Sequence, residues 1–134
     1  MRILGLDYGS KTVGVAISDE LGITAQGIET IIRTKENQLR KTLTRIESIC
    51  VEYGVTDIVL GLPKNMDGSL GFQAQDCMNF AQKIVGFDII MEDERLTSEE
   101  AENRLRSRKV DFRKNKGAVD IESACVILEQ YLGK

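Results

Sequence analysis

The chain has 134 residues, of which 42% are apolar and 29% are charged, enough apolar side chains for the core of one ordinary domain spanning residues 1–134. This composition argues against disorder and against a small fold held by disulfides. Because the sequence has no histidine, Ser-His-Asp hydrolysis, histidine-bound zinc and imidazole acid–base catalysis are excluded. Any chemistry must use carboxylates, amines, hydroxyls or thiols.

The cysteines and the N-terminal segment indicate the compartment. Cys50, Cys77 and Cys125 are far apart and form no C-x-x-C pair, so we expect reduced, buried thiols. The first apolar stretch is short and is broken by Gly5 and Asp7, which fits neither a signal peptide nor a membrane span. We therefore expect a cytoplasmic protein.

The net charge of −3 argues against a protein that coats nucleic acid by bulk charge, but the local charge is uneven. Seven basic residues against the single acid Asp111 lie in one stretch, 104–116: Arg104, Arg106, Arg108, Lys109, Arg113, Lys114 and Lys116. Such a stretch can hold phosphates without reading bases. The alternative is a solvated helix end followed by a loop.

The first third of the chain predicts strands. Residues 2–7 form an apolar run that ends at an acid, residues 12–18 alternate small and branched side chains, and residues 23–32 are rich in Ile and Thr toward their end. The turn signal after the first run predicts a hairpin. We expect three antiparallel strands in series.

From there the hydrophobic period changes to about 3.6 residues. It predicts a helix over 35–53, a strand over 57–62, a helix marked by apolar residues from Leu70 to Val85, and a strand over 87–91. A capping box at Thr97 and Glu100 predicts a short helix to about Ser107. A last helix is expected from about 118 to 132. The order βββαβαβαα predicts an α/β fold with a mixed sheet of about five strands, three antiparallel and then parallel, flanked by helices.

Acidic residues stand where strands end or a helix begins: Asp7 after the first strand, Asp93 and Glu94 after the fifth, and Asp120 near the start of the last helix. Ligands gather at the carboxyl edge of such a sheet, so these residues could meet in space. Converging carboxylates repel unless a cation joins them, which points to Mg²⁺ or Mn²⁺. Two such ions about 3.5–4 Å apart can cleave a phosphodiester without histidine.

Each acid also has a structural interpretation. Asp7 could cap a turn, the 93–94 pair could be a loop favoured by the dipole of the next helix, and Asp120 could be a first-turn acid. Asp120 shares one helix face with Ser123, Ala124 and Ile127, however. A carboxylate on a packed face needs a partner.

Four motifs in chain order resemble those of the YqgF/RuvX family, Holliday-junction-resolvase-like nucleases of the ribonuclease-H-like superfamily that are also described as pre-16S ribosomal RNA nucleases. The motifs cover nearly the whole chain. They are Gly5-Leu6-Asp7-Tyr8-Gly9-Ser10-Lys11-Thr12-Val13-Gly14-Val15-Ala16, Leu60-Gly61-Leu62-Pro63-Lys64-Asn65-Met66-Asp67-Gly68-Ser69, Asp93-Glu94-Arg95-Leu96-Thr97, and Asp120 with Ser123-Ala124 and Ile127-Leu128.

The resemblance implies a ribonuclease-H-like fold and a cytoplasmic nuclease that depends on Mg²⁺ or Mn²⁺ and matures the 5′ end of small-subunit ribosomal RNA. Asp7, Glu94 and Asp120 would be its catalytic residues and metal ligands. The choice of Glu94 over Asp93 rests on the family pattern, since strand alternation alone cannot decide it. Candidate contacts to nucleic acid are Lys11, Arg95, Arg106, Arg108, Arg113 and Lys114.

Two other functions stay open: a Holliday-junction resolvase acting on branched DNA, and an inactive scaffold that binds nucleic acid. A resolvase implies a homodimer because it needs two sites across a symmetric junction, whereas RNA end trimming needs only one site and is compatible with a monomer. We expect no membrane partner. The seven Phe and Tyr residues form no evident stacking surface, so sequence-specific reading of single strands is not predicted.

Overall fold

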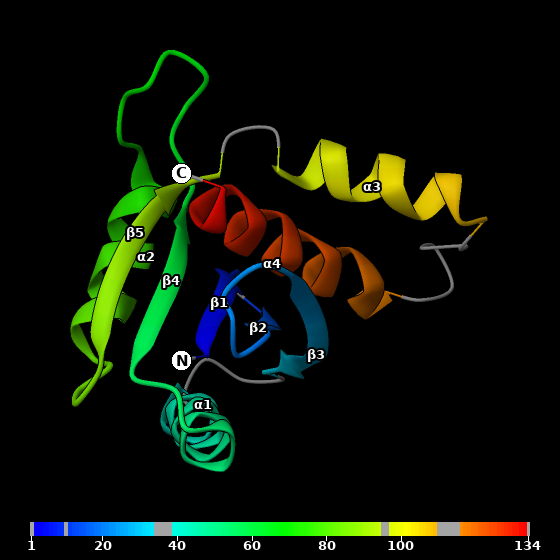
Figure 1. Cartoon of the computed structure of the whole chain (residues 1–134). Coiled ribbons are helices and arrows are strands. Elements are labelled where there is room, and N and C mark those ends of the chain that lie inside the picture. The colour runs from blue at the N-terminus through cyan, green and yellow to red at the C-terminus, as the bar shows by residue number, and fades with distance from the viewer. Residues whose placement is uncertain (1, 10, 34–38, 95–96, 110–115, 134) are drawn as a thin grey trace.

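The computed structural model describes residues 2–9, 11–33, 39–94, 97–109 and 116–133, and in this part of the chain the elements follow the predicted order βββαβαβαα (Figure 1). The strands are β1 (Ile3–Tyr8), β2 (Thr12–Ser18), β3 (Ala25–Ile32), β4 (Asp57–Leu62) and β5 (Asp88–Asp93). The helices are α1 (Leu39–Tyr53), α2 (Phe72–Gln82), α3 (Thr97–Ser107) and α4 (Lys116–Leu132).

The five strands form one mixed sheet in the order β3-β2-β1-β4-β5. The β1–β2 and β2–β3 pairs are antiparallel, and the β1–β4 and β4–β5 pairs are parallel. This confirms the predicted fold class. It also puts β1 at the centre of the sheet, so that the end of β1 is flanked by strands on both sides.

Large apolar side chains build the core on the sheet face that α1 and α2 cover. Every second residue of β2, namely Val13, Val15 and Ile17, packs there against buried residues of α1 such as Ile46 and Ile49. Burial of this apolar surface is the main stabilising contribution to the fold.

The opposite face is lined by glycines, and α4 lies directly on it with α3 beside α4 (Figure 1). A Cβ atom on Gly5 would lie 2.9 Å from Leu128 Cβ, and one on Gly14 would overlap the backbone carbonyl of Asp120. Such distances leave no room for a side chain. The glycines therefore set how closely α4 approaches the sheet, and with it the position of Asp120.

Some predicted element ends differ from the structure. Residues 35–38 of the first predicted helix lie outside the described ranges. Leu70 and Val85 lie outside α2 and are exposed. The prediction of a capping box at Thr97 was wrong. Helix α3 already begins at this residue, and its backbone N–H donates to Glu94 O (3.0 Å). The threonine hydroxyl is buried without a hydrogen-bond partner.

The three cysteines are buried and unbridged, as predicted, and burial raises the pKa of each thiol. Among the helices described, none is long and apolar enough to cross a membrane.

Candidate active site

Asp7 lies near the carboxyl end of β1, on the sheet face that α4 covers. In the antiparallel register it stands opposite Gly14 of β2. Strand alternation places it on the same face as Gly5, against which α4 packs. The central strand thus places the Asp7 carboxylate between the edge of the sheet and α4.

Glu94 reaches Asp7 from the neighbouring side of the sheet. Its backbone N–H donates to Leu62 O (3.2 Å), which extends the β4–β5 pairing by one residue. Its side chain shares a hydrogen bond with Asp7, so that one of the two carboxyl groups carries a proton. A Cβ atom on Gly61 would lie only 2.5 Å from Glu94 Oε2. The glycine therefore leaves the space that this carboxyl group occupies.

Asp93 lies on the other face of the sheet. It is paired with Leu62 at the end of β5 and follows Met91 by two residues, and Met91 packs into the core beneath α1 and α2. The structure thus brings Glu94, and not Asp93, into contact with Asp7.

Asp120 joins the pair from the first turns of α4. Its backbone carbonyl rests on Gly14, the residue opposite Asp7. The side chain accepts a hydrogen bond from the hydroxyl of Thr12, at the start of β2. The negative charge of Asp120 raises the pKa of Asp7. The three predicted acids are therefore brought together by a strand end, the residue after a strand and a helix start.

Burial raises the pKa of all three carboxyl groups. For Asp7 the value is about 6, where burial is the largest cause, the hydrogen bond with Glu94 acts against it and the charge of Asp120 adds to it. For Glu94 it is about 9, because burial is reinforced by the charge of Asp7. For Asp120 burial raises the pKa and the Thr12 hydrogen bond opposes the rise. Raised pKa values of this kind are expected where carboxyl groups are buried close to one another.

Within the described ranges, no three acidic or cysteine side chains form a ready-made cage around one point. Mg²⁺ seldom uses such a cage, because it keeps several waters and takes one or two carboxylates together with substrate phosphates. The hydrogen-bonded pair of Asp7 and Glu94, with Asp120 nearby, fits an ion that is held by one or two carboxylates, by water and by a substrate phosphate.

A buried arginine that the sequence did not single out holds the loop beside Asp7. Arg33 Nη2 donates to Gly9 O (2.5 Å), and the guanidinium lies 5.0 Å from the ring centre of Tyr8. Tyr8 in turn stacks on Phe80 of α2, with ring centres 4.0 Å apart. Arg33 therefore fixes the turn after β1 against the rest of the fold.

Comparison with known proteins identifies the family. The sequence pattern of the RuvX family, described as Holliday junction resolvase, matches residues 1–134. The chain belongs to the RuvX family. A protein of Lachnospira eligens called "Putative pre-16S rRNA nuclease" is 48% identical over 135 residues, covering 98% of this chain and 96% of its own. A Bacillus cereus (strain B4264) protein of the same name is 46% identical over 137 residues, which cover 100% of this chain and 99% of the Bacillus protein.

Solved structures show the same fold at low sequence identity. Thermus thermophilus RuvC in complex with a Holliday junction substrate matches this RuvX protein with a TM-score of 0.61 and 12% identity, covering 98% of this chain and 93% of RuvC. The Fowlpox virus resolvase in complex with Holliday junction DNA gives a TM-score of 0.63 and 16% identity, covering 99% and 97%. The ribonuclease-H-like architecture predicted from the sequence is thereby confirmed.

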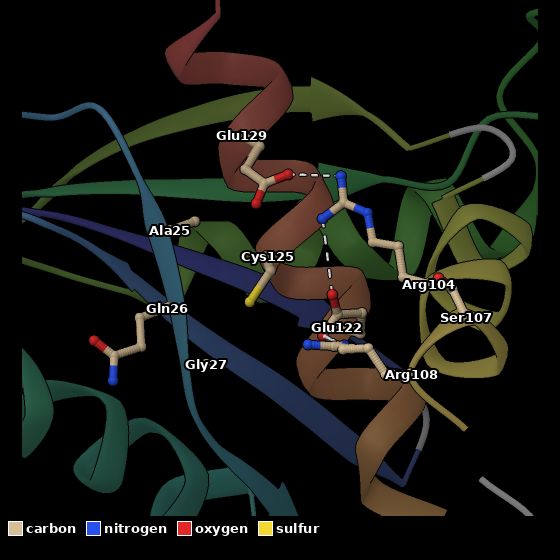
Figure 2. A pocket seen from close by; sticks show the side chains of 9 residues that line it. All are labelled: Ala25, Gln26, Gly27, Arg104, Ser107, Arg108, Glu122, Cys125 and Glu129. Carbon is tan, nitrogen blue, oxygen red and sulfur yellow. Dashed lines mark ion pairs between the residues drawn. The ribbon is translucent and has the colours of Figure 1, made fainter. Parts of the chain in front are cut away.

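Two arginines of the basic stretch of this RuvX protein, Arg104 and Arg108, lie beside the α4 acids Glu122 and Glu129 (Figure 2). Arg104 pairs with Glu129 (2.7 Å), Glu100 (3.1 Å) and Glu122 (3.7 Å), and Arg108 pairs with Glu122 (2.7 Å). Arg104, Arg108, Glu122 and Glu129 line a cavity of about 530 Å³ between β3, α3 and α4, and none of the three clustered acids is among its lining residues. For Arg104 and Arg108, the local count of charges therefore overstated the free positive charge.

Of the other predicted nucleic-acid contacts, the structure describes Lys11 and Arg106, which lie in different parts of the fold. Lys11 is exposed in the turn between β1 and β2. Arg106 is largely exposed, with Glu102 at 3.8 Å. Arg95, Arg113 and Lys114 lie outside the described residues.

A second cavity, of about 250 Å³, borders the acids. It is lined by Tyr8, Gly9, Pro63, Phe72, Gln73, Asp76 and Glu94. Phe72 is 87% exposed. An aromatic surface at this place was not predictable from the sequence, because the exposure of the ring depends on how the β4–α2 connection folds.

Proposed function

We propose that this RuvX nuclease cleaves phosphodiester bonds of structured RNA in the maturation of the 5′ end of pre-16S ribosomal RNA, with Asp7, Glu94 and Asp120 as catalytic residues. The observation that carries the proposal is the convergence of these three carboxyl groups in one partly buried cluster. The names of the relatives at 46–48% identity supply the substrate.

The same three residues would hold Mg²⁺ or Mn²⁺. Asp7 and Glu94 would give up their shared proton, since a carboxylate must be ionised to bind a cation. Thr12 would keep the Asp120 side chain oriented toward the pair. When bound, such ions supply an activated water and stabilise the negative charge on the leaving oxygen. The high pKa values of the acids favour ion binding at neutral to alkaline pH.

Basic residues around the site would hold the phosphate backbone. We assign this role to Lys11, Arg106 and Arg108, and to Arg95, Arg113 and Lys114 outside the described ranges. Lys11 is next to Thr12, whose hydroxyl contacts Asp120. Arg108 would have to exchange Glu122 for a phosphate. Contacts of this kind position a substrate and carry no sequence information.

Cleavage of branched DNA is the second candidate. The resemblance of the fold to two resolvases solved with Holliday junctions favours it. A resolvase would act as a homodimer, because both strands of a symmetric junction must be cut. An inactive scaffold is disfavoured by the presence of all three acids.

Cleavage assays distinguish these functions. The protein is incubated with RNA spanning the 5′ processing site, with a four-way DNA junction and with plain duplexes, each with Mg²⁺, with Mn²⁺ or with a chelator. We expect cleavage of the RNA only with metal, and none by Asp7→Asn. Symmetric cutting of the junction with intact RNA would support the resolvase, and binding without cleavage of any substrate would support the scaffold.

A further inference from the structure

The cavity of about 250 Å³ is continuous with the acid cluster, because Glu94 both contacts Asp7 and lines it. Its volume is below the roughly 300–1,000 Å³ that is usual for pockets holding drug-sized ligands. A ligand that entered it would therefore be small and would lie beside the proposed reaction centre.

Phe72 gives this cavity an aromatic wall. It is the first residue of α2 and has the most exposed large apolar side chain that the structure describes, with 87% of its surface accessible. The rest of the helix is anchored, since Cys77 and Phe80 are buried in the core. A phenyl ring held in water on a fixed helix is unfavourable unless a partner covers it in the working state.

The connection that leads into Phe72 is ordered by its own hydrogen bonds. Asn65 N–H donates to Ser69 O (2.9 Å), Asn65 Nδ2 donates to Ser69 Oγ (3.0 Å), and the Ser69 hydroxyl donates to Asp67 Oδ1 (2.6 Å). The ring is thus presented by a preorganised segment. A ligand that stacks on it would bind without first having to order the loop.

The polar lining suits a nucleobase better than a phosphate. The described residues that line the cavity include the carboxyl groups of Asp76 and Glu94 and the amide of Gln73, and no lysine or arginine is among them. Among these residues a phosphate would meet two acids and no cation. The edge of a base carries N–H donors that a carboxylate can accept and acceptors to which an amide can donate.

We propose that this cavity receives one unpaired nucleobase, which stacks on Phe72 while its edge faces Gln73 and Asp76. The inference rests on the proposed function and deepens it, because the base would belong to a nucleotide beside the bond that is cut. Bases within a continuous duplex have both faces covered and cannot stack on a protein ring. The substrate is therefore a strand that is unpaired, or opened, at the cleaved position.

The test is a double-mutant cycle, in which loss of the Phe72 ring is combined with loss of a single base of the RNA. Affinity is measured with Ca²⁺, under conditions where the RNA stays intact, for a single-stranded RNA of the 5′ processing site and for copies with an abasic residue at each position in turn. Phe72→Ala should weaken binding of the intact RNA about 5- to 100-fold, since stacking of one base is worth about 1–3 kcal/mol. With the abasic residue at one position, the same substitution should change affinity less than about twofold.

Matched variants isolate the stacking contact. Phe72→Tyr keeps a ring and should bind like the parent, whereas Phe72→Leu keeps only an apolar side chain and should bind like Phe72→Ala. Val85→Ala removes a side chain that is equally exposed (83%) but lies outside the cavity, and it should leave binding unchanged. Because Phe72 is exposed, all of these variants should fold, which circular dichroism would check.

Two results would overturn the proposal: an effect of Phe72→Ala that is the same at every abasic position, or tighter binding of a continuous duplex than of the single strand. Cleavage is scored separately. Metal-dependent cleavage without any coupling between Phe72 and a base would leave the nuclease proposal standing and remove this one. Coupling without cleavage of any substrate would do the reverse.

Discussion

The contact between Asp7 and Glu94 is the most informative detail at the scale of single residues, because it separates Glu94 from its neighbour Asp93. Glu94→Gln removes a carboxylate from the cluster and should lower the cleavage rate by at least about 100-fold, as loss of one charge-stabilising group in an active site usually does. Asp93→Asn is the matched control and should change the rate only slightly. Single-turnover cleavage of the RNA measures both. Equal losses in the two variants would contradict the assignment.

The pH dependence of stability follows from the raised pKa values. Unfolded, Asp7 and Glu94 ionise near 3.8 and 4.5; folded, their pKa values are about 6 and about 9. The folded protein thus binds more protons between these values, so the metal-free protein should lose stability as the pH rises from about 4 to about 9. Urea unfolding in a chelator should show this fall, and a smaller one in Asp7→Asn. Identical pH slopes would mean that the pair is not buried together.

The acids and their meeting at one edge of the sheet were predictable, but the contacts among them were not. Asp7 and Asp120 were found from a strand end and a helix start, which are local signals. Glu94 was chosen over Asp93 from the family pattern. The physical basis of its contact with Asp7, which is the parallel register of β5 with β4 and the space left by Gly61, comes only from the structure. Arg33 escaped notice because its contacts with Gly9 and Tyr8 are distant in sequence, and Phe72 because its exposure depends on how the β4–α2 connection folds.

At the scale of elements, the position of α4 decides whether Asp120 reaches the site. A Cβ atom on Gly14 would overlap the backbone of Asp120, so Gly14→Ala must push the start of α4 away from β2. Overpacking of this kind costs about 1–3 kcal/mol, and we expect that loss together with a large drop in cleavage. Gly133→Ala, just after the end of the same helix, meets only two carbonyl oxygens, at 3.3 and 3.9 Å, and is the control. A Gly14→Ala protein with full activity and parental stability would refute this view of α4.

The ion pairs between α3 and α4 predict that removing an acid strengthens the binding of nucleic acid. Glu122 accepts from Arg108 and lies near Arg104, so Glu122→Gln should free positive charge for phosphates. Stability should fall by less than about 1 kcal/mol, as is usual for ion pairs near the surface. The slope of log affinity against log salt should steepen by about one per new phosphate contact. Unchanged affinity and slope would show that these arginines stay away from the substrate.

Element types were readable from the sequence because the hydrophobic period changes sharply after β3. The ends of the helices and strands were harder to predict. Thr97 looked like a helix cap, yet its side chain turns into the core, where packing outweighs the capping preference. Arg104 and Arg108 looked free because two of the acids that pair with them, Glu122 and Glu129, come from a later helix.

At the scale of the whole molecule, the topology could be derived because helices separate the later strands and force them to be parallel. That arrangement places β1 between an antiparallel and a parallel neighbour. The site is thus built from the sheet centre, its parallel edge and the final helix. The full-length match to RuvX proteins agrees with a site assembled from both ends of the chain.

The central claim is that Asp7, Glu94 and Asp120 hold a divalent cation jointly with the phosphate of a nucleic acid. Calorimetric titration of Mg²⁺ into the protein, alone and with a cleavage-resistant RNA of the 5′ processing site, tests it most directly. Metal should bind weakly alone and more tightly with RNA, and RNA should bind more tightly with metal by the same factor. Asp7→Asn should lose this coupling. Equal metal affinities with and without RNA would contradict the account and leave the acids with a structural role.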